Sequence, residues 1–246
     1  MAQKIRLDVL IFQKGLIPSL NKSTAIVMEG KVAVDGKIIT KPGFAVSESS
    51  EISIKESDEF VSRGGIKLKK ALEEFFVCVK DKICLDVGAS TGGFTDCLLK
   101  NGAKKVYSVD VSCGVFDFKL RNNPRVVNIE KTNIRYFDKK FLEDEIDLAV
   151  VDVSFISLEK VLPKVQELLK TGGEIIALVK PQFEAPKGST PKGVVKDDKI
   201  RRQAIDKIKN FSKEIGLKLF CETPSPIKGP KGNLEHFLYL KKSNEI

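Results

Sequence analysis

Short apolar runs recur along the chain from residue 61 onward, and each has the length of a buried strand. Polar or amphipathic stretches separate them, an alternation typical of a mostly parallel sheet covered by helices. The clearest helical pattern spans residues 200–215, where apolar side chains recur with a period of 3.6. We therefore predict an α/β fold for this part, with strands at residues 83–87, 106–110, 126–129, 148–153, 174–179, 218–221 and 237–240.

The first 45 residues have a different pattern, with two short helices followed by a hairpin. Apolar residues at helical spacing between positions 7 and 11 predict a first helix that Gly15 can end. A second helix is predicted between an N-cap at Asn21 and a stop at Gly30. Asp35-Gly36 is typical of a hairpin turn between strands at 31–34 and 37–39. This α+β unit of roughly 50 residues is too small for a deep catalytic pocket.

The net charge of the chain suggests a polyanionic partner, and a change in charge along the chain marks the end of the N-terminal region. The 246 residues carry a formal net charge of +9, which favours contact with nucleic acid or an anionic membrane. Residues 1–45 carry a net charge of +4, whereas the Ser- and Glu-rich residues 46–60 carry −4 and are predicted to form turns and a linker. We place the domain boundary there, giving domains of residues 1–59 and 60–246.

Several classes of protein are disfavoured by what the sequence does not contain. The most apolar stretch, residues 148–156, is interrupted by Asp152 and is too short to span a membrane, and the N-terminus has no signal-peptide pattern. We therefore expect a cytoplasmic location and no membrane partner. No metal site is expected, since the chain has one histidine, His236, expected in a strand, and no C-x-x-C motif. We expect all five cysteines to be small buried hydrophobic residues: Cys78, Cys84, Cys97, Cys113 and Cys221.

The strongest chemical signal is a predicted strand that runs into a glycine-rich turn and then a helix, over residues 85–95. Gly88 and Gly92 fit a turn whose backbone lies against a nucleotide cofactor, but the spacing is neither G-x-G-x-x-G nor a P-loop. Asp110 ends the next strand, 24 positions after Asp86, where a carboxylate can accept hydrogen bonds from a ribose diol. The alternative is an ordinary strand–loop–helix with a capping aspartate, which the combination of turn and strand-end carboxylate disfavours.

Five ordered motifs carry a resemblance to a known family. The sequence resembles the TlyA (hemolysin A) family, in which an S4-type RNA-binding domain precedes an FtsJ-like S-adenosylmethionine-dependent methyltransferase. The resemblance implies a Rossmann-like class I methyltransferase sheet with helices on both faces, joined to a small N-terminal S4-type α+β domain. The motifs are residues 61–68 (VSRGGIKL), 86–98 (DVGASTGGFTDCL), 152–158 (DVSFISL), 179–184 (VKPQFE) and 229–235 (GPKGNLE).

The resemblance implies ribose 2′-O-methylation of ribosomal RNA, of cytidine in 23S or 16S rRNA or in both. A Lys-Asp-Lys-Glu set then falls on Lys67, Asp152, Lys180 and Glu235. A ribose hydroxyl is a weak nucleophile, so the site must align it and take up or stabilise its proton. We expect Lys180 nearest the hydroxyl, Lys67 beside it favouring its neutral form, and the two carboxylates positioning the amines. Taken singly, these residues are typical surface charges or caps.

The same resemblance assigns S-adenosylmethionine as the cofactor and five residues to it. Asp86, Gly88, Gly92 and Thr95 are expected around its methionine part, and Asp110 at its ribose. Either Thr132 or Asn133 is expected near the adenine, and the sequence favours neither of the two.

RNA contacts are expected from two regions. The S4 resemblance points to Arg6, Lys14, Lys22 and Lys31, although Asn21-Lys22 stands where the family more often has Ser-Arg. The second region is the Pro- and Gly-containing segment 181–193 with its continuation to Arg202, which follows directly after the predicted catalytic lysine and carries Lys187 and Lys192.

Three other functions are weighed against this one. A pseudouridine synthase, which can also carry an S4-type domain, needs no glycine-rich cofactor turn. A membrane-lysing hemolysin would need a spanning segment or a long basic amphipathic helix, and neither is found. An RNA-binding ribosome assembly factor without turnover is disfavoured by the complete Lys-Asp-Lys-Glu set. The sequence decides neither the target nucleotide nor the oligomeric state.

Overall fold

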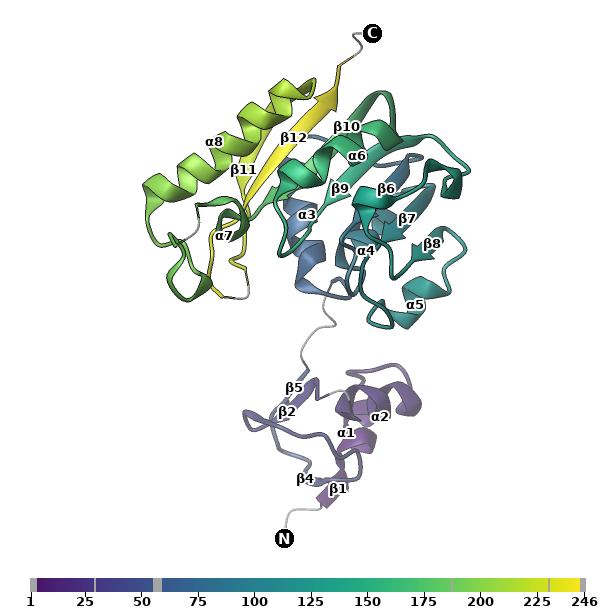
Figure 1. Cartoon of the computed structure of the whole chain (residues 1–246). Helices are drawn as coiled ribbons and strands as arrows, with labels where there is room; N and C mark the ends of the chain where they lie inside the picture. The colour runs from purple at the N-terminus through teal and green to yellow at the C-terminus, as the bar shows by residue number, and fades with distance from the viewer. Residues whose placement is uncertain (1–3, 29, 55–58, 187, 230, 244–246) are drawn as a thin grey trace. The chain divides into compact units, whose positions relative to one another are not determined.

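A computed structural model of the chain describes residues 4–28, 30–54, 59–186, 188–229 and 231–243 (Figure 1). The chain divides into two compact units, residues Met1–Asp58 and Glu59–Ile246. Each unit has its own apolar core, so each has the basic requirement of a separate domain.

In the part of the N-terminal unit that the structure describes, two helices and five short strands pack around a small core. Strand β2 pairs antiparallel with β3 and β5, and β1 pairs antiparallel with β4. Leu7 and Leu10 of the first helix and Val27 of the second pack against Val32 and Val46 in this core. The elements are β1 (Lys4–Arg6), α1 (Leu7–Gln13), α2 (Leu20–Met28), β2 (Val32–Val34), β3 (Lys37–Ile38), β4 (Ala45–Ser47) and β5 (Ile52–Ile54).

The predicted hairpin is confirmed, and two other expectations for this unit are wrong. Asp35 and Gly36 both have positive φ, as a two-residue hairpin turn requires. Helix α2 begins at Leu20 instead of after Asn21, because the Ser19 hydroxyl accepts a hydrogen bond from the Lys22 N–H (3.3 Å). The segment 46–60, expected to be turns and linker, contributes part of β4 and all of β5, which complete the sheets of this unit.

The C-terminal unit is built on a seven-stranded sheet in the order β11-β12-β10-β9-β6-β7-β8. Strands β10, β9, β6, β7 and β8 are parallel, and β12 runs antiparallel to both of its neighbours. This confirms the predicted mostly parallel α/β sheet. The strands are β6 (Ile83–Val87), β7 (Lys105–Val109), β8 (Val126–Ile129), β9 (Ile146–Val151), β10 (Leu169–Val179), β11 (Leu217–Pro224) and β12 (His236–Lys242).

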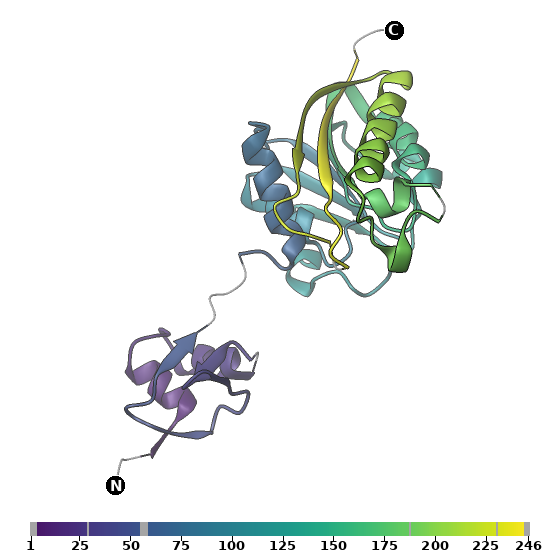
Figure 2. The ribbon, with the colours of Figure 1, turned by 90° about the vertical axis from the view of Figure 1, so that its left-hand side faces the viewer.

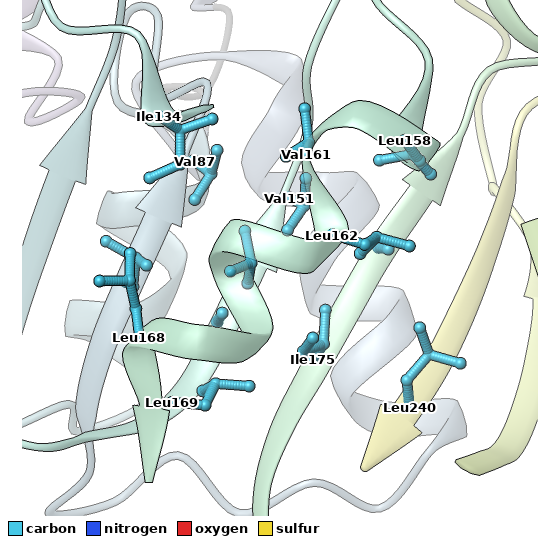
Figure 3. Packing of buried hydrophobic residues seen from close by; sticks show 14 of the residues in the cluster. Val87, Ile134, Val151, Leu158, Val161, Leu162, Leu168, Leu169, Ile175 and Leu240 are labelled. Atoms are coloured by element: carbon cyan, nitrogen blue, oxygen red, sulfur yellow. The ribbon is translucent and has the colours of Figure 1, made fainter. Parts of the chain in front are cut away.

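Helices cover both faces of this sheet, as predicted. In Figure 2 the blue helix α3 and the light green helix α8 lie on opposite sides of the strands. Figure 3 shows the core on the α6 side, where Val161 and Leu162 pack against Val151 and Ile175. The helices are α3 (Arg63–Glu74), α4 (Gly93–Lys100), α5 (Phe118–Arg121), α6 (Leu162–Leu168), α7 (Pro181–Glu184) and α8 (Asp198–Glu214), with 3-10 turns at η1 (Ile134–Tyr136), η2 (Lys139–Phe141), η3 (Leu158–Lys160) and η4 (Pro191–Gly193).

The order of the strands determines where a ligand binds. The chain leaves β6 towards β7 on one side, whereas β9 lies on the other side of β6, so the topology reverses between β6 and β9. Ligands of open α/β sheets bind beyond the carboxyl ends of the strands at such a reversal. Residues 88–92 and 152–158 follow these two strand ends, and both segments belong to the motifs found in the sequence.

The expected burial of the cysteines is wrong for three of the five. Cys84 and Cys97 are buried in the sheet and in α4, but Cys78, Cys113 and Cys221 are exposed. An apolar neighbour in sequence is a poor guide at a loop or on an edge strand such as β11, where alternate side chains face solvent.

Candidate active site

A cavity of about 640 Å³ opens at the carboxyl ends of β6, β7 and β9. A second cavity of about 330 Å³ shares Gly88, Ser90, Thr91 and Asp152 with it and reaches the start of α3. Together they lie where the sheet topology places a ligand. Residues that line the larger cavity include Val87, Gly88, Ser90, Asp110, Val111, Ser112, Val115, Asn133, Arg135, Asp152, Ser154 and Phe155.

Gly88 joins the two central strand ends through a close backbone contact. Its φ is +86°, and a Cβ atom there would lie 2.4 Å from the carbonyl oxygen of Asp152. The Gly88 N–H donates to the carbonyl of Val109 (2.9 Å), and the Asp152 N–H donates to the carbonyl of Val87 (2.9 Å). The sequence predicted a glycine that lets a ligand approach; the structure adds that glycine also lets the β6 turn lie against Asp152.

Asp86 and Thr95 lie beneath the glycine-rich turn and line neither cavity. The Thr95 hydroxyl donates to Asp86 Oδ2 (2.6 Å) and lies 2.7 Å from the Ser108 hydroxyl. Burial raises the pKa of Asp86 to about 7, against the opposing effect of the Thr95 hydrogen bond. Within the described residues Asp86 Oδ1 has no hydrogen-bond partner.

Gly92, also expected at the cofactor, is buried at the start of α4 and lines neither cavity. Its φ is +95°, and a Cβ atom there would lie 2.4 Å from the Leu120 side chain. Direct contacts of Asp86, Gly92 and Thr95 with a cofactor therefore stay predictions, while Gly88 and Asp110 do line the larger cavity.

Asp110 is held rigidly at the end of β7. Its Oδ2 accepts a hydrogen bond from the Ser90 N–H (2.7 Å), and its Oδ1 accepts from the N–H (2.7 Å) and hydroxyl (2.6 Å) of Ser112. A carboxylate has about four acceptor positions, so capacity for a ribose hydroxyl is left after these three bonds. Ser90 has a φ of +50°, a conformation uncommon for a residue other than glycine, and strain of this kind clusters at ligand sites.

Two ammonium–carboxylate pairs form the charged part of the site. Lys67 Nζ of α3 lies 2.5 Å from Glu235 Oε2, although 168 positions separate them in sequence. Both residues are buried, with 7% and 2% exposure. The remaining Glu235 oxygen has no partner among the described residues, and Gly229 lies so close that a Cβ there would be 2.4 Å from it.

The second pair links the ends of β9 and β10. Lys180 Nζ lies 2.5 Å from Asp152 Oδ1 and 2.8 Å from the Ser154 hydroxyl. Lys67 and Asp152 line the smaller cavity, so one member of each pair faces the same cavity. The structure thus brings together all four residues that the sequence assigned to catalysis. The predicted effect of Lys67 on the protonation of Lys180 stays a prediction, because the described contacts are within each pair.

Ser154 and Phe155 are site residues that the sequence analysis did not assign a role. Phe155 has a φ of +63° and is 91% exposed, with its ring centroid 5.2 Å from that of Phe183. Both Phe155 and Ser154 line the larger cavity. The available signal was their position directly after a strand-end aspartate, inside a motif.

The predicted RNA-contact residues of the N-terminal unit differ in their surroundings. Arg6 Nη2 lies 2.7 Å from Asp8 Oδ2, and this hydrogen bond lowers the pKa of the Asp8 carboxyl. Lys14 donates to the carbonyl of Ser50 (3.3 Å), and Lys22 is exposed. Lys31 is half-buried.

In the C-terminal unit, Lys192 is exposed at a positive φ of +54°, whereas Lys187 lies outside the described residues. None of the helices that the structure describes is long and apolar enough to cross a membrane. His236 begins β12, as expected for a strand residue, and its Nε2 lies 3.6 Å from Glu222.

Comparison with known proteins agrees with this organisation. The family model of FtsJ-like methyltransferases matches residues 60–242, and that of the S4 domain matches residues 5–52. "Hemolysin A" of Brachyspira hyodysenteriae is 42% identical over 96% of this chain and 99% of its own length. "16S/23S rRNA (cytidine-2'-O)-methyltransferase TlyA" of Mycobacterium tuberculosis is 40% identical over 100% of this chain and 92% of its own.

A solved structure extends the similarity to three dimensions. The structure described as a putative hemolysin from Streptococcus thermophilus superposes with a TM-score of 0.76 at 39% identity, covering 100% of this chain and 90% of that one. With both domains matched in order and relatives aligned over nearly their whole length, this chain belongs to the TlyA/hemolysin A family of FtsJ-like methyltransferases with an N-terminal S4 domain.

Proposed function

We propose that this protein transfers a methyl group from S-adenosylmethionine to the ribose 2′-hydroxyl of a cytidine in ribosomal RNA. The observation that carries the proposal is the meeting of the Lys67–Glu235 and Lys180–Asp152 pairs beside a cavity at the carboxyl ends of β6, β7 and β9. Relatives aligned over the whole chain are named for this reaction, and the FtsJ-like domain supports the same chemistry.

The residues at the cavity fit S-adenosylmethionine. Asp110 keeps acceptor capacity for a ribose diol, and Asn133 lies at the same cavity with a side chain able to contact a base. Gly88 lines this cavity without a side chain, so the backbone of the turn is accessible to a ligand there. When bound, the cofactor supplies a methyl group on a sulfonium centre, which needs no further activation.

The chain must then supply alignment of the hydroxyl and a place for its proton. Lys180 is held by Asp152 and Ser154, so its amine points in one fixed direction without an entropic cost at the moment of reaction. We place this group next to the 2′-oxygen, where a neutral amine takes up the hydroxyl proton, or an ammonium stabilises the negative charge that develops on the oxygen. Asp152 orients Lys180.

The buried Lys67–Glu235 pair belongs to the same site through Lys67, which lines the smaller cavity. A buried ion pair is costly to desolvate and is weak evidence for a stabilising role. Its position at the smaller cavity instead favours a role in positioning the reacting groups.

Exposed groups of the chain suit an RNA substrate. The Phe155 ring, 91% exposed beside Ser154, offers a face on which a nucleobase can stack. Basic residues of the N-terminal unit and Lys192 supply the phosphate contacts that hold structured RNA. Lys187 is proposed on its sequence position alone. Since the substrate is ribosomal RNA or a ribosomal subunit, we place the reaction in the cytoplasm.

The test is transfer of a labelled methyl group from S-adenosylmethionine to purified ribosomal subunits and their extracted RNAs, mapped by primer extension sensitive to ribose methylation. We expect one new stop at a cytidine, absent with Lys180→Ala. Separate reactions with subunits and naked RNA identify the preferred substrate. Cofactor binding without transfer to any RNA would favour an assembly factor without turnover, the competing function.

A further inference from the structure

Two motif segments beside the active site are joined at both of their ends. Segment 152–158 follows β9, and segment 180–184 follows β10. At the first end, Lys180 contacts Asp152 and Ser154 (2.5 and 2.8 Å). In the middle, the rings of Phe155 and Phe183 pack with centroids 5.2 Å apart.

The other end is held by a carboxylate that the reaction does not use. Glu184, the last residue of α7, is 5% exposed. Its Oε1 accepts a hydrogen bond from the Leu158 N–H (2.8 Å), and its Oε2 accepts from the Ser157 hydroxyl (2.5 Å). Lys207 Nζ of α8 lies 3.8 Å from Glu184 Oε2. Glu184 therefore caps the 3-10 turn η3 from a different segment of the chain.

The buried position of this carboxylate needs an explanation. Burial raises the pKa of Glu184, against the lowering effect of its hydrogen bonds to Ser157 and Leu158. An apolar residue at the end of α7 would avoid the desolvation, but it would leave the Leu158 N–H buried without a partner. The segment also holds Phe155 at a φ of +63°, a conformation that persists only where surrounding contacts fix it.

We infer that Glu184 is a positioning residue: by fixing segment 152–158 to α7, it holds Lys180 in its contacts with Asp152 and Ser154. This inference rests on the proposed function for its meaning, because Lys180 is the proposed catalytic amine. Its structural content is independent of activity: without Glu184, the two segments separate and the Lys180 amine becomes accessible.

The direct test is the rate at which Lys180 is acetylated by an amine-reactive ester, read by mass spectrometry relative to the exposed Lys140. We expect at least a fivefold increase in Glu184→Ala, a smaller increase in Ser157→Ala, and a rate within twofold of the parent in Glu184→Gln. Glutamine keeps an oxygen for the Leu158 N–H and an amide donor for Ser157.

Asp147→Ala is the matched control. Asp147 also accepts a hydrogen bond from a backbone N–H (Ile83, 2.7 Å), but it lies at the amino end of β9, at the opposite edge of the sheet. The Asp147→Ala variant should have a lower melting temperature than the parent but the same rate of Lys180 acetylation. An unchanged Lys180 rate in Glu184→Ala, or an equal increase in Asp147→Ala, would overturn the inference.

Methyl transfer gives a second readout that separates this inference from the proposed function. In single-turnover experiments, Glu184→Ala should lower the rate tenfold or more, with the affinity for S-adenosylhomocysteine within threefold of the parent and the rate recovered in Glu184→Gln. A parent protein with no transfer activity would defeat the proposed function alone, since the acetylation result stands without it. An active Glu184→Ala with the parent's rate would defeat the inference alone.

Discussion

Two lysines of the C-terminal unit and two of the N-terminal unit have opposite surroundings. In the C-terminal unit, Lys67 and Lys180 have largely buried side chains that contact Glu235 and Asp152. In the N-terminal unit, Lys14 and Lys22 are exposed. Buried charges keep a fixed geometry at the cost of desolvation, whereas exposed ones act on a polyanion over a Debye length and are screened by salt. This contrast matches the proposed division between residues that act in methyl transfer and residues that contact RNA.

The largest expected effect comes from breaking the Lys67–Glu235 pair. Lys67→Met or Glu235→Leu alone leaves one buried charge without its partner, which should lower the free energy of unfolding by about 3–5 kcal/mol. The double variant should recover much of this stability in urea unfolding but none of the methyl transfer. Single variants that cost less than about 1 kcal/mol would mean that the pair behaves like a surface ion pair.

The second effect, which depends on pH, is expected from Asp86, which is buried without a cationic partner among the described residues. Its folded-state pKa of about 7 lies above the ordinary 3.8, so the folded state binds more protons between these values. Its contribution to stability is therefore lost as pH rises from about 4 to 7. Asp86→Asn should remove this loss, so its urea midpoint should exceed the parent's above pH 7 and approach it near pH 4. Parallel pH profiles for parent and variant would contradict this account.

The smallest effects are expected on the exposed side of the comparison. Lys14→Ala and Lys22→Ala should each weaken RNA binding a fewfold and reduce the slope of log affinity against log salt by up to about 0.9, without changing cofactor affinity. Lys37→Ala, another exposed lysine of the same unit, serves as the control. Equal losses for all three lysines would indicate a general charge effect in place of the predicted contacts.

The α/β sheet was predictable because its strands are long and apolar enough to carry a clear pattern. β6 and β8 match their predicted ranges. β10 begins at Leu169, earlier than predicted. The prediction missed this part of the strand because it contains polar or small residues such as Lys170 and Gly172. The three-residue strands β4 and β5 were missed, since three residues cannot show an alternation and their flanks are rich in Ser and Glu.

The family resemblance pointed to charged residues that form two ion pairs in the structure, but not to the contacts between them. The four charged residues came from a family resemblance, and nothing in their spacing revealed which lysine contacts which carboxylate across 168 positions. The exposure of Phe155 depends on a positive φ at a residue other than glycine, which no sequence pattern signals. The capping role of Glu184 likewise depends on the packing of α7 against η3, which only the folded chain determines.

The most direct test of the proposed division between the two units measures both methyl transfer and RNA binding with one unmethylated substrate RNA. Single-turnover methyl transfer at saturating cofactor and the dissociation constant for RNA are measured for Lys180→Ala and for the double variant Lys14→Ala/Lys22→Ala. We predict that Lys180→Ala loses about a hundredfold or more in rate and keeps its RNA affinity, while the double variant loses affinity and, once RNA is saturating, keeps its rate. A Lys180→Ala protein with the parent's rate would contradict the account.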